Sequence, residues 1–225
     1  MTIADFETFI FAQRPTASEH YDAGYFTGDW RAEGNNYSLE TRREIEARNP
    51  ALIKDVFTPK RVLDLGCGPG ALMHLLWELG IDCDGIDFAE SSRQLATPQV
   101  RDRIRIGNTT DSLVPDGSYD LVICREVLEH LTVLQVRRTV ANMARITSRF
   151  IYVTTRFHPA PGSLIDVTTQ FEVDPTHITL LNKDFLRLLF VLEGCRSRPD
   201  LEARMDWAGK GRVLVLEKIS GEQGE

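Results

Sequence analysis

Short apolar segments alternate with amphipathic segments along most of the chain. Residues 61–65 form an apolar run that ends in closely spaced glycines and is followed directly by an amphipathic segment over 71–79. This order predicts a strand, a tight loop and a helix, the opening unit of a doubly wound α/β sheet. Because glycines allow sharp turns and close approach to the backbone, we expect a ligand-binding loop here.

The same alternation predicts the remaining elements. The pattern of apolar and polar residues predicts strands near 81–87, 103–107, 119–124 and 149–155, and a closing antiparallel hairpin over 196–203 and 211–219. Amphipathic runs predict helices near 50–57 and from about 90, 132 and 182. Thr132 and Gln135 form a capping-box pattern, and Asn182 is a favoured cap residue. Residues 157–181 lack such periodicity, and long connections of this kind are usually functional.

Length and composition restrict the class of protein. The 225 residues, 42% hydrophobic and 26% charged, suffice for one α/β domain with an appendage. The net charge of -7 without a basic run argues against nucleic acid as the main partner. The sequence shows neither a signal peptide nor the roughly 18 apolar residues of a membrane span, so we expect a cytoplasmic location. We expect a monomer or a homodimer. Four widely spaced cysteines without a C-x-x-C pair indicate reduced thiols.

The charges around the glycine loop narrow the choice of ligand. The segment Gly66–Ala71 satisfies the loose fingerprint of dinucleotide-binding loops, and Asp84 and Asp87 lie near the expected position of its ribose-binding acid. Asp64, two residues before the first glycine, would repel a pyrophosphate but attract a cationic ligand. S-Adenosylmethionine, with an ammonium and a sulfonium, has that charge. An NAD-linked oxidoreductase is the alternative.

Four motifs in order carry a family resemblance. They are Asp64-Leu-Gly66-Cys-Gly68-Pro-Gly70, then Gly85–Phe88, Gly107–Asp111 and Ser118–His130, and they span about the middle half of the chain. With these motifs the chain resembles the class I S-adenosylmethionine-dependent methyltransferases of the small-molecule type. The resemblance implies a Rossmann-like seven-stranded sheet, six strands parallel and one antiparallel, with an N-terminal helical cap. It also implies S-adenosylmethionine as the cofactor.

The resemblance further implies roles for individual residues. Asp87 would accept both ribose hydroxyls, and Phe88 would cover one face of the adenine. Asn108 stands where many relatives have an aspartate that accepts the adenine amino group; its amide oxygen can make the same bond, or Asp111 can replace it. The expected cofactor-binding residues are Asp64, Gly66, Gly68, Gly70, Asp87, Phe88, Asn108, Thr109, Asp111, Cys124 and Arg125.

The residues after the strand near 119–124 bear on the acceptor. Enzymes of this superfamily that methylate planar amino groups carry an Asn/Asp-Pro-Pro-aromatic motif here, whereas this chain has Cys124-Arg-Glu-Val. Cys124 ends an apolar strand, so we interpret it as a core thiol rather than a nucleophile. These features favour methyl transfer to a hydroxyl or amine of a small molecule, for example a sugar or a secondary metabolite.

Histidines are the candidate general bases. His177 occupies a place where many small-molecule methyltransferases of this class have an active-site histidine, and His158 follows the strand near 149–155 on the same side of the sheet. A hydroxyl acceptor needs a base near neutral pH, so we expect these two residues to be catalytic. A plain loop histidine is the alternative for His177. No metal ion is expected, because the spacing of these histidines, Asp166 and Asp174 is not diagnostic.

Residues 1–50 are expected to form the helical cap, and residues 51–225 the S-adenosylmethionine-binding domain. The aromatic and glycine-rich stretch near 20–30 suits a lid that excludes water. Its candidate substrate-contacting residues are Tyr21, Tyr25, Trp30 and Tyr37. An ordinary packing appendage or a dimer contact is the alternative for the cap. For the whole chain, a protein methyltransferase and a catalytically silent cofactor-binding subunit remain further alternatives.

Overall fold

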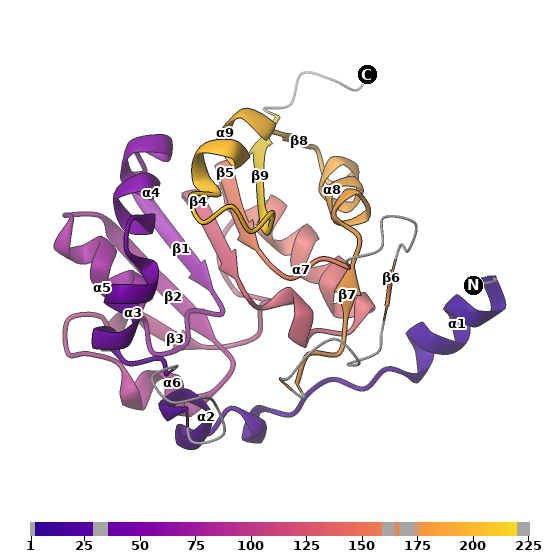
Figure 1. Ribbon diagram of the computed structural model, residues 1–225, viewed down its shortest axis with the longest axis horizontal. Helices are drawn as coiled ribbons and strands as arrows, with labels where there is room; N and C mark the ends of the chain where they lie inside the picture. The colour runs from indigo at the N-terminus through magenta and orange to yellow at the C-terminus, as the bar shows by residue number, and fades with distance from the viewer. Residues whose placement is uncertain (1–2, 29–35, 159–164, 167–173, 175, 220–225) are drawn as a thin grey trace.

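The computed structural model describes residues 3–28, 36–158, 165–166, 174 and 176–219. Within them a central sheet runs through the molecule with helices on both faces (Figure 1). Its seven strands have the spatial order β3-β2-β1-β4-β5-β9-β8. They are β1 (Arg61–Leu65), β2 (Asp82–Asp87), β3 (Ile104–Ile106), β4 (Tyr119–Arg125), β5 (Thr147–Thr154), β8 (Cys195–Ser197) and β9 (Val213–Lys218). A second, two-stranded sheet pairs β6 (Ile165–Asp166) with β7 (Leu180–Leu181).

Strand directions confirm the predicted fold class. The neighbours from β3 to β5 are all parallel, β9 is antiparallel to β5, and β8 is antiparallel to β9. Six strands therefore run one way and β9 runs the other. The strand predicted over 196–203 is wrong beyond Ser197, because α9 (Pro199–Met205) follows. Pro199 suits a first helical position, and Leu201 and Met205, four residues apart, both bury on the sheet.

Each face of the sheet has its own core. In β4, Leu121 and Ile123 pack with α4 (Asn49–Phe57), α5 (Ala71–Glu78) and α9, whereas Val122 and Cys124 pack with α7 (Val133–Ile146) and α8 (Lys183–Leu192). Alternate residues of a strand point to opposite faces, and a strand buried on both sides is apolar throughout. The continuous apolar runs of the sequence are explained by this double covering. Shorter helical segments are α6 (Glu90–Leu95), η2 (Arg101–Arg103) and η3 (Leu128–His130).

Local start signals position two of the helices. The Thr132 hydroxyl accepts a hydrogen bond from the Gln135 backbone N–H at 3.2 Å, and the Gln135 side chain accepts one from the Thr132 N–H at 2.9 Å. This is the predicted capping box. Asn182 likewise accepts from the backbone N–H groups of Asp184 and Phe185, which confirms the predicted start of α8. None of the described helices combines the length and apolar character that a membrane crossing requires.

The N-terminal 50 residues contain α1 (Ile3–Ala12), η1 (Ser18–His20), α2 (Ala23–Thr27) and α3 (Leu39–Glu46). Helix α1 extends away from the sheet, whereas α2 lies beside α6 at the sheet's lower end (Figure 1). Gln13 ties the segment between them to the body of the protein. Its side-chain amide donates to the Ile178 carbonyl at 3.1 Å and to Thr179 Oγ1 at 2.9 Å, and its oxygen accepts from the Val133 N–H at 2.8 Å.

Candidate active site

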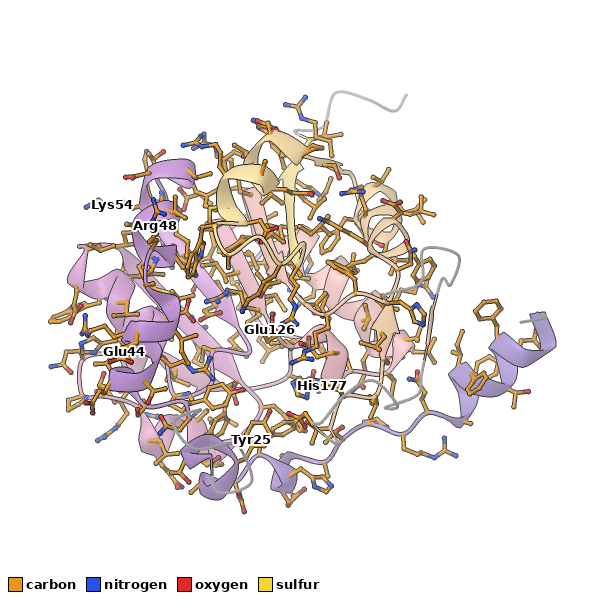
Figure 2. The ribbon with its side chains drawn as sticks, viewed as in Figure 1. Tyr25, Glu44, Arg48, Lys54, Glu126 and His177 are labelled. Atoms are coloured by element: carbon orange, nitrogen blue, oxygen red, sulfur yellow. The ribbon has the colours of Figure 1, made fainter. Side chains whose placement is uncertain are left out.

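A cavity of about 680 Å³ lies at the carboxyl ends of β1, β2, β4 and β5. Ligands of open α/β sheets bind at this edge, where the order of the strands reverses. The walls come from the glycine loop, the strand ends, α2, α3 and the segment between α9 and β9. Figure 2 shows Glu126 and His177 near the strand ends and Tyr25 on α2, on the opposite side of this region. A cavity of this size is typical of sites for small molecules and cofactors.

The glycine loop is held tightly against the neighbouring strand ends. The Gly66 N–H donates to the Ile86 carbonyl at 2.7 Å, and Gly66 and Gly68 have φ angles of +78° and +53°. A Cβ added at Gly66 would lie 2.3 Å from Val127 Cγ2. The loop therefore needs glycine at position 66 both for its backbone conformation and for the close approach of Val127.

Asp87 fastens the loop to the end of β2. One carboxylate oxygen accepts the Gly68 N–H at 2.8 Å and the other accepts the Ala89 N–H at 3.0 Å. Burial raises the pKa of Asp87, although these hydrogen bonds oppose that change. A carboxylate offers about four acceptor positions, so Asp87 retains capacity for hydroxyl donors in the cavity that it lines.

Asp64 belongs to a buried charge network. Its carboxylate is 4% exposed at the end of β1 and lines the cavity. Burial raises the pKa of Asp64 to about 7; the Arg125 guanidinium opposes this rise, and the carboxylates of Glu46 and Asp87 add to it. Arg125 Nη1 lies 2.7 Å from Glu46 Oε2, and Asn49 donates to the same oxygen at 2.9 Å. A cation beside Asp64 would favour its ionised form.

Aromatic side chains of the N-terminal segment cover the glycine loop. The rings of Tyr25 and Tyr37 stack with centroids 5.9 Å apart, and Phe26 packs edge-on against both. Phe26 Cε1 would lie 3.4 Å from a Cβ at Gly68, so it rests directly on the loop. Tyr21, Tyr25 and Tyr37 all line the cavity, as expected for pocket residues. Trp30 lies outside the described residues.

The expected adenine-side residues are arranged partly as predicted. Phe88, Asn108 and Thr109 line the cavity. The Asn108 side-chain oxygen already accepts from the Thr110 N–H at 3.0 Å and from Thr110 Oγ1 at 2.9 Å. Because a carbonyl oxygen has two lone pairs, that oxygen is saturated by its own turn. An adenine amino group would therefore need a different acceptor.

Four expected site residues lie away from the cavity. Cys124 is fully buried in the core, consistent with an inert thiol, and burial raises its pKa well above the usual range. Gly70 precedes α5 with a φ of +74°, and Asp111 is solvent-exposed. The His158 N–H donates to the Leu181 carbonyl, which places this residue beside β7. The described residues that line the cavity do not include Gly70, Asp111, Cys124 or His158. Direct contact between these four residues and a ligand is therefore not supported.

His177 has neighbours that the sequence interpretation did not assign to it. The ligand atoms of Glu129, His130 and His177 all lie within 4.8 Å of one another, and the two imidazole centroids are 4.6 Å apart. His158 does not belong to this cluster. Asp174 Oδ2 lies 3.7 Å from His177 Nε2 and accepts from the Tyr25 hydroxyl at 3.4 Å. The aromatic cap and the histidine cluster are therefore in contact.

Sequence reasoning also missed a polar group on the β9 side of the cavity. Arg156 follows β5, and Trp207, Lys210 and Arg212 lie in the connection between α9 and β9. Arg212 Nη1 is 3.9 Å from Glu126 Oε2. The sequence interpretation gave none of these residues a role: Arg156 lay between a strand and the long connection, and the other three lay in the predicted hairpin. Helix α9 places the connection that follows it, residues 206–212, beside the cavity. No local sequence motif indicates this position.

The residues present fit S-adenosylmethionine. Asp64 supplies negative charge for a cationic donor, Asp87 supplies acceptors for ribose hydroxyls, and the aromatic cap supplies apolar cover. The cavity volume accommodates a cofactor of this size together with part of an acceptor. In addition, the charged groups nearest the glycine loop are acids, which disfavours a pyrophosphate at this position.

Comparison with known proteins agrees with this fit. A methyltransferase-domain family model matches residues 63–149. A probable tocopherol O-methyltransferase of Oryza sativa is 30% identical over 171 residues, 72% of this chain and 43% of that protein. A ubiquinone biosynthesis O-methyltransferase of Bordetella avium is 36% identical over 78 residues, 32% of each chain. The chain spans less than half the length of these curated relatives.

A solved structure shares the fold. An S-adenosylmethionine-dependent methyltransferase from Archaeoglobus fulgidus aligns with a TM-score of 0.61 at 19% identity, over 80% of this chain and 95% of that one. The strand order, the acidic residue before the glycine loop and the family match agree with one another. Residues 63–149 match a methyltransferase domain, and the sheet has the Rossmann-like fold of a solved S-adenosylmethionine-dependent methyltransferase.

Proposed function

We propose that the chain is an S-adenosylmethionine-dependent methyltransferase that transfers a methyl group to a hydroxyl or amine of a small molecule. The observation that carries this proposal is the pair of buried carboxylates, Asp64 and Asp87, on either side of the glycine loop in one cavity. The two carboxylates provide negative charge and accept hydrogen bonds from hydroxyl groups. A dinucleotide would place its negatively charged phosphates in the same position, where these carboxylates would repel them. The relatives that are named O-methyltransferases support the same reaction class.

The bound cofactor supplies a methyl group on a sulfonium, which is already activated for a one-step displacement. The protein's task is then to align the groups and exclude water. Asp64 and Asp87 hold the donor end of the cavity, and the cap residues Tyr25, Phe26 and Tyr37 close it from the side of α2. His177 and Glu126 face the opposite part of the same cavity, where an acceptor would lie.

Residues 1–50 act as the cap in this proposal, and the β9 side binds the acceptor. The aromatic cluster on the glycine loop supports the first role. Arg156, Lys210 and Arg212 support an acceptor with an anionic group, because they bring positive charge to the cavity wall. Trp207, 38% exposed, offers an apolar face beside them.

We further propose a cytoplasmic location and a monomeric or homodimeric protein without nucleic-acid partners. The net charge of -7 supports the absence of a nucleic-acid partner. All four cysteines are free thiols, which suits a reducing compartment.

Calorimetry with several cofactors tests the proposed function. We expect S-adenosylmethionine and S-adenosylhomocysteine to bind with dissociation constants of roughly micromolar, and NAD⁺ and NADH not to bind. Release of S-adenosylhomocysteine should then be screened against phenols, sugars, amines and anionic hydroxylated compounds. Binding of nicotinamide dinucleotides without binding of the sulfonium compound would overturn the proposal.

The affinity for S-adenosylmethionine is expected to rise with pH up to about 7. Burial raises the pKa of Asp64 to about 7, and a bound cation would lower it again because it stabilises the carboxylate. Binding therefore releases a proton below pH 7, and the affinity should fall by up to about tenfold for each pH unit below that value. Calorimetry at pH 6 in two buffers of different ionisation enthalpy measures the released proton.

Asp64→Asn is the control for this pH dependence, since Asn has nearly the same shape and does not titrate. In this variant we expect weaker binding at pH 7.5 and little proton release at pH 6. The other charged groups facing Asp64 are Arg125, Glu46 and Asp87, and all three remain in the variant. Equal proton release by both proteins would show that Asp64 is not the titrating group.

A further inference from the structure

Glu129, His130 and His177 form a compact cluster below the acceptor side of the cavity. Their carboxylate and imidazole ligand atoms lie within 4.8 Å of one another. Glu129 and His130 come from η3, directly after β4, whereas His177 comes from the segment before β7. Hydrogen bonds from the Ile178 and Thr179 N–H groups to the Glu129 carbonyl, at 2.8 Å and 3.1 Å, hold the two segments together.

We propose that this cluster binds one divalent transition-metal ion, with Glu129, His130 and His177 as its protein ligands. Glu129 is 1% exposed, and its Oε2 accepts a hydrogen bond from the Thr155 hydroxyl at 2.8 Å. In the described part of the chain, Oε1 of Glu129 has no hydrogen-bond donor. A buried carboxylate oxygen without a donor costs free energy, and a cation in this cluster would supply the missing partner.

The contacts around His130 prepare it to bind a metal ion. The Thr176 hydroxyl donates its single proton to Asp174 Oδ1 at 2.6 Å, so it can only accept from His130 Nδ1, which lies 2.8 Å away. The proton of neutral His130 is therefore on Nδ1, and the lone pair is on Nε2. Metal-binding histidines usually have their second nitrogen fixed in this way by an outer residue.

A neighbouring acid adds negative charge to the cluster. Glu126 lies close to Glu129 and has a φ of +52°, in the left-handed region that non-glycine residues rarely adopt. This conformation is strained and persists only where the surroundings enforce it. It turns Glu126 into the wall of the cavity above the cluster. Arg212, 3.9 Å from Glu126, offsets part of the negative charge, and a divalent cation would offset the repulsion that remains between the two carboxylates.

The chemistry of the ligands indicates the class of metal. Imidazole nitrogens suit Mn²⁺, Fe²⁺, Co²⁺ and Zn²⁺, whereas Ca²⁺ and Mg²⁺ prefer sites made only of oxygen atoms. One carboxylate and two imidazoles also leave coordination positions for other ligands, as catalytic metal sites do.

This inference deepens the proposed function and rests on it for the role of the metal. The cation would bind the acceptor oxygen and lower the pKa of its hydroxyl. The hydroxyl proton passes to solvent, the oxygen forms a bond to the methyl carbon, and the carbon–sulfur bond breaks to leave a neutral thioether. His177 is then a metal ligand rather than the general base that sequence analysis predicts.

Binding of Mn²⁺ to the isolated protein, followed by electron paramagnetic resonance, tests the site without cofactor or acceptor. We expect one Mn²⁺ per chain, with spin-echo modulation from two imidazole nitrogens in the unaltered protein. Glu129→Gln and His177→Asn should each weaken binding by about 100-fold. His20→Asn is the matched control, because His20 is exposed in η1 and should leave Mn²⁺ binding unchanged.

The imidazole signal of the unaltered protein does not depend on the folding of any variant. Absence of stoichiometric Mn²⁺ binding, or binding without nitrogen coupling, would overturn the proposed site. Methyl transfer that is undiminished after chelation would overturn the catalytic role. Mn²⁺ binding in a protein that does not bind S-adenosylmethionine would instead refute the proposed function and leave the site in place.

Discussion

Replacing Glu46 by Gln is expected to lower the free energy of unfolding by about 3 kcal/mol. Glu46 and Arg125 form an ion pair of 2.7 Å whose side chains are only 7% and 22% exposed. Arg125 Nε is buried without a hydrogen-bond partner in the described chain, so the guanidinium depends on Glu46 for its stabilisation. Loss of the carboxylate leaves a buried positive charge with a weaker partner. Urea denaturation of both proteins measures the difference.

Glu78→Gln is the matched control, because Glu78 of α5 pairs on the surface with Arg43, which lies in the same helix as Glu46. That pair is also short, at 2.6 Å, but the side chains of Arg43 and Glu78 are 50% and 36% exposed, so we expect a much smaller loss of stability than at Glu46. Combining Glu46→Gln with Arg125→Met should restore part of the stability, since the uncompensated charge is gone. Equal losses at Glu46 and Glu78 would contradict a special role for the buried pair.

The effect of Glu46→Gln should also depend on pH. Burial raises the pKa of Glu46, but the attraction of Arg125 outweighs it and holds that pKa below its usual value. A carboxyl with a lowered pKa contributes stability above its usual pKa and loses it as pH falls through the folded-state value. The difference between the two proteins should therefore shrink in acid.

Replacing Asp87 by Asn is expected to weaken S-adenosylmethionine binding by about 100-fold. Both Asp87 oxygens accept backbone N–H groups, from Gly68 and Ala89. Asn has one acceptor oxygen and one amino group, so one of these N–H groups would face another donor. The glycine loop loses a charged hydrogen bond worth about 1.5–3 kcal/mol, and the cavity loses ribose acceptors. Calorimetry with S-adenosylhomocysteine measures the change.

Asp82→Asn controls for the loss of an aspartate from the same strand. Asp82 begins β2, is half exposed and pairs with Arg103 on the surface, far along the strand from the cavity. We expect unchanged binding and a stability change below about 1 kcal/mol. If the folded Asp87→Asn variant still binds S-adenosylhomocysteine tightly, Asp87 only stabilises the fold and does not bind the cofactor.

The parallel part of the fold follows from local patterns in the sequence. Apolar runs predict β1 and β4 closely, because strands buried on both faces need mostly apolar residues. Caps at Thr132 and Asn182 predict the helix starts, since these side chains act within one turn. Helix α9 escapes prediction because 199–205 is short and its packing against α4 comes from a distant part of the chain.

The cofactor side of the cavity is more predictable than the acceptor side. Asp64, Gly66 and Asp87 are adjacent in sequence to the strand ends that position them. Glu129 and His177, by contrast, are about 50 residues apart in the chain, so no local pattern connects them. The sequence analysis grouped His177 with His158 instead, because both follow the strand near 149–155. Likewise, no pattern near Arg125 indicates that Glu46, 79 residues earlier, is its partner.

The contact between Gly66 and Val127 has a consequence for engineering this protein. No side chain at position 66 fits against Val127. A redesign of acceptor preference therefore has to leave both residues unchanged. Libraries that aim to change selectivity are best directed to Trp207 and Lys210, which line the cavity wall on the connection between α9 and β9, outside the strand pairing of the described sheet. Diversity there can reshape the entrance while the donor end keeps its geometry.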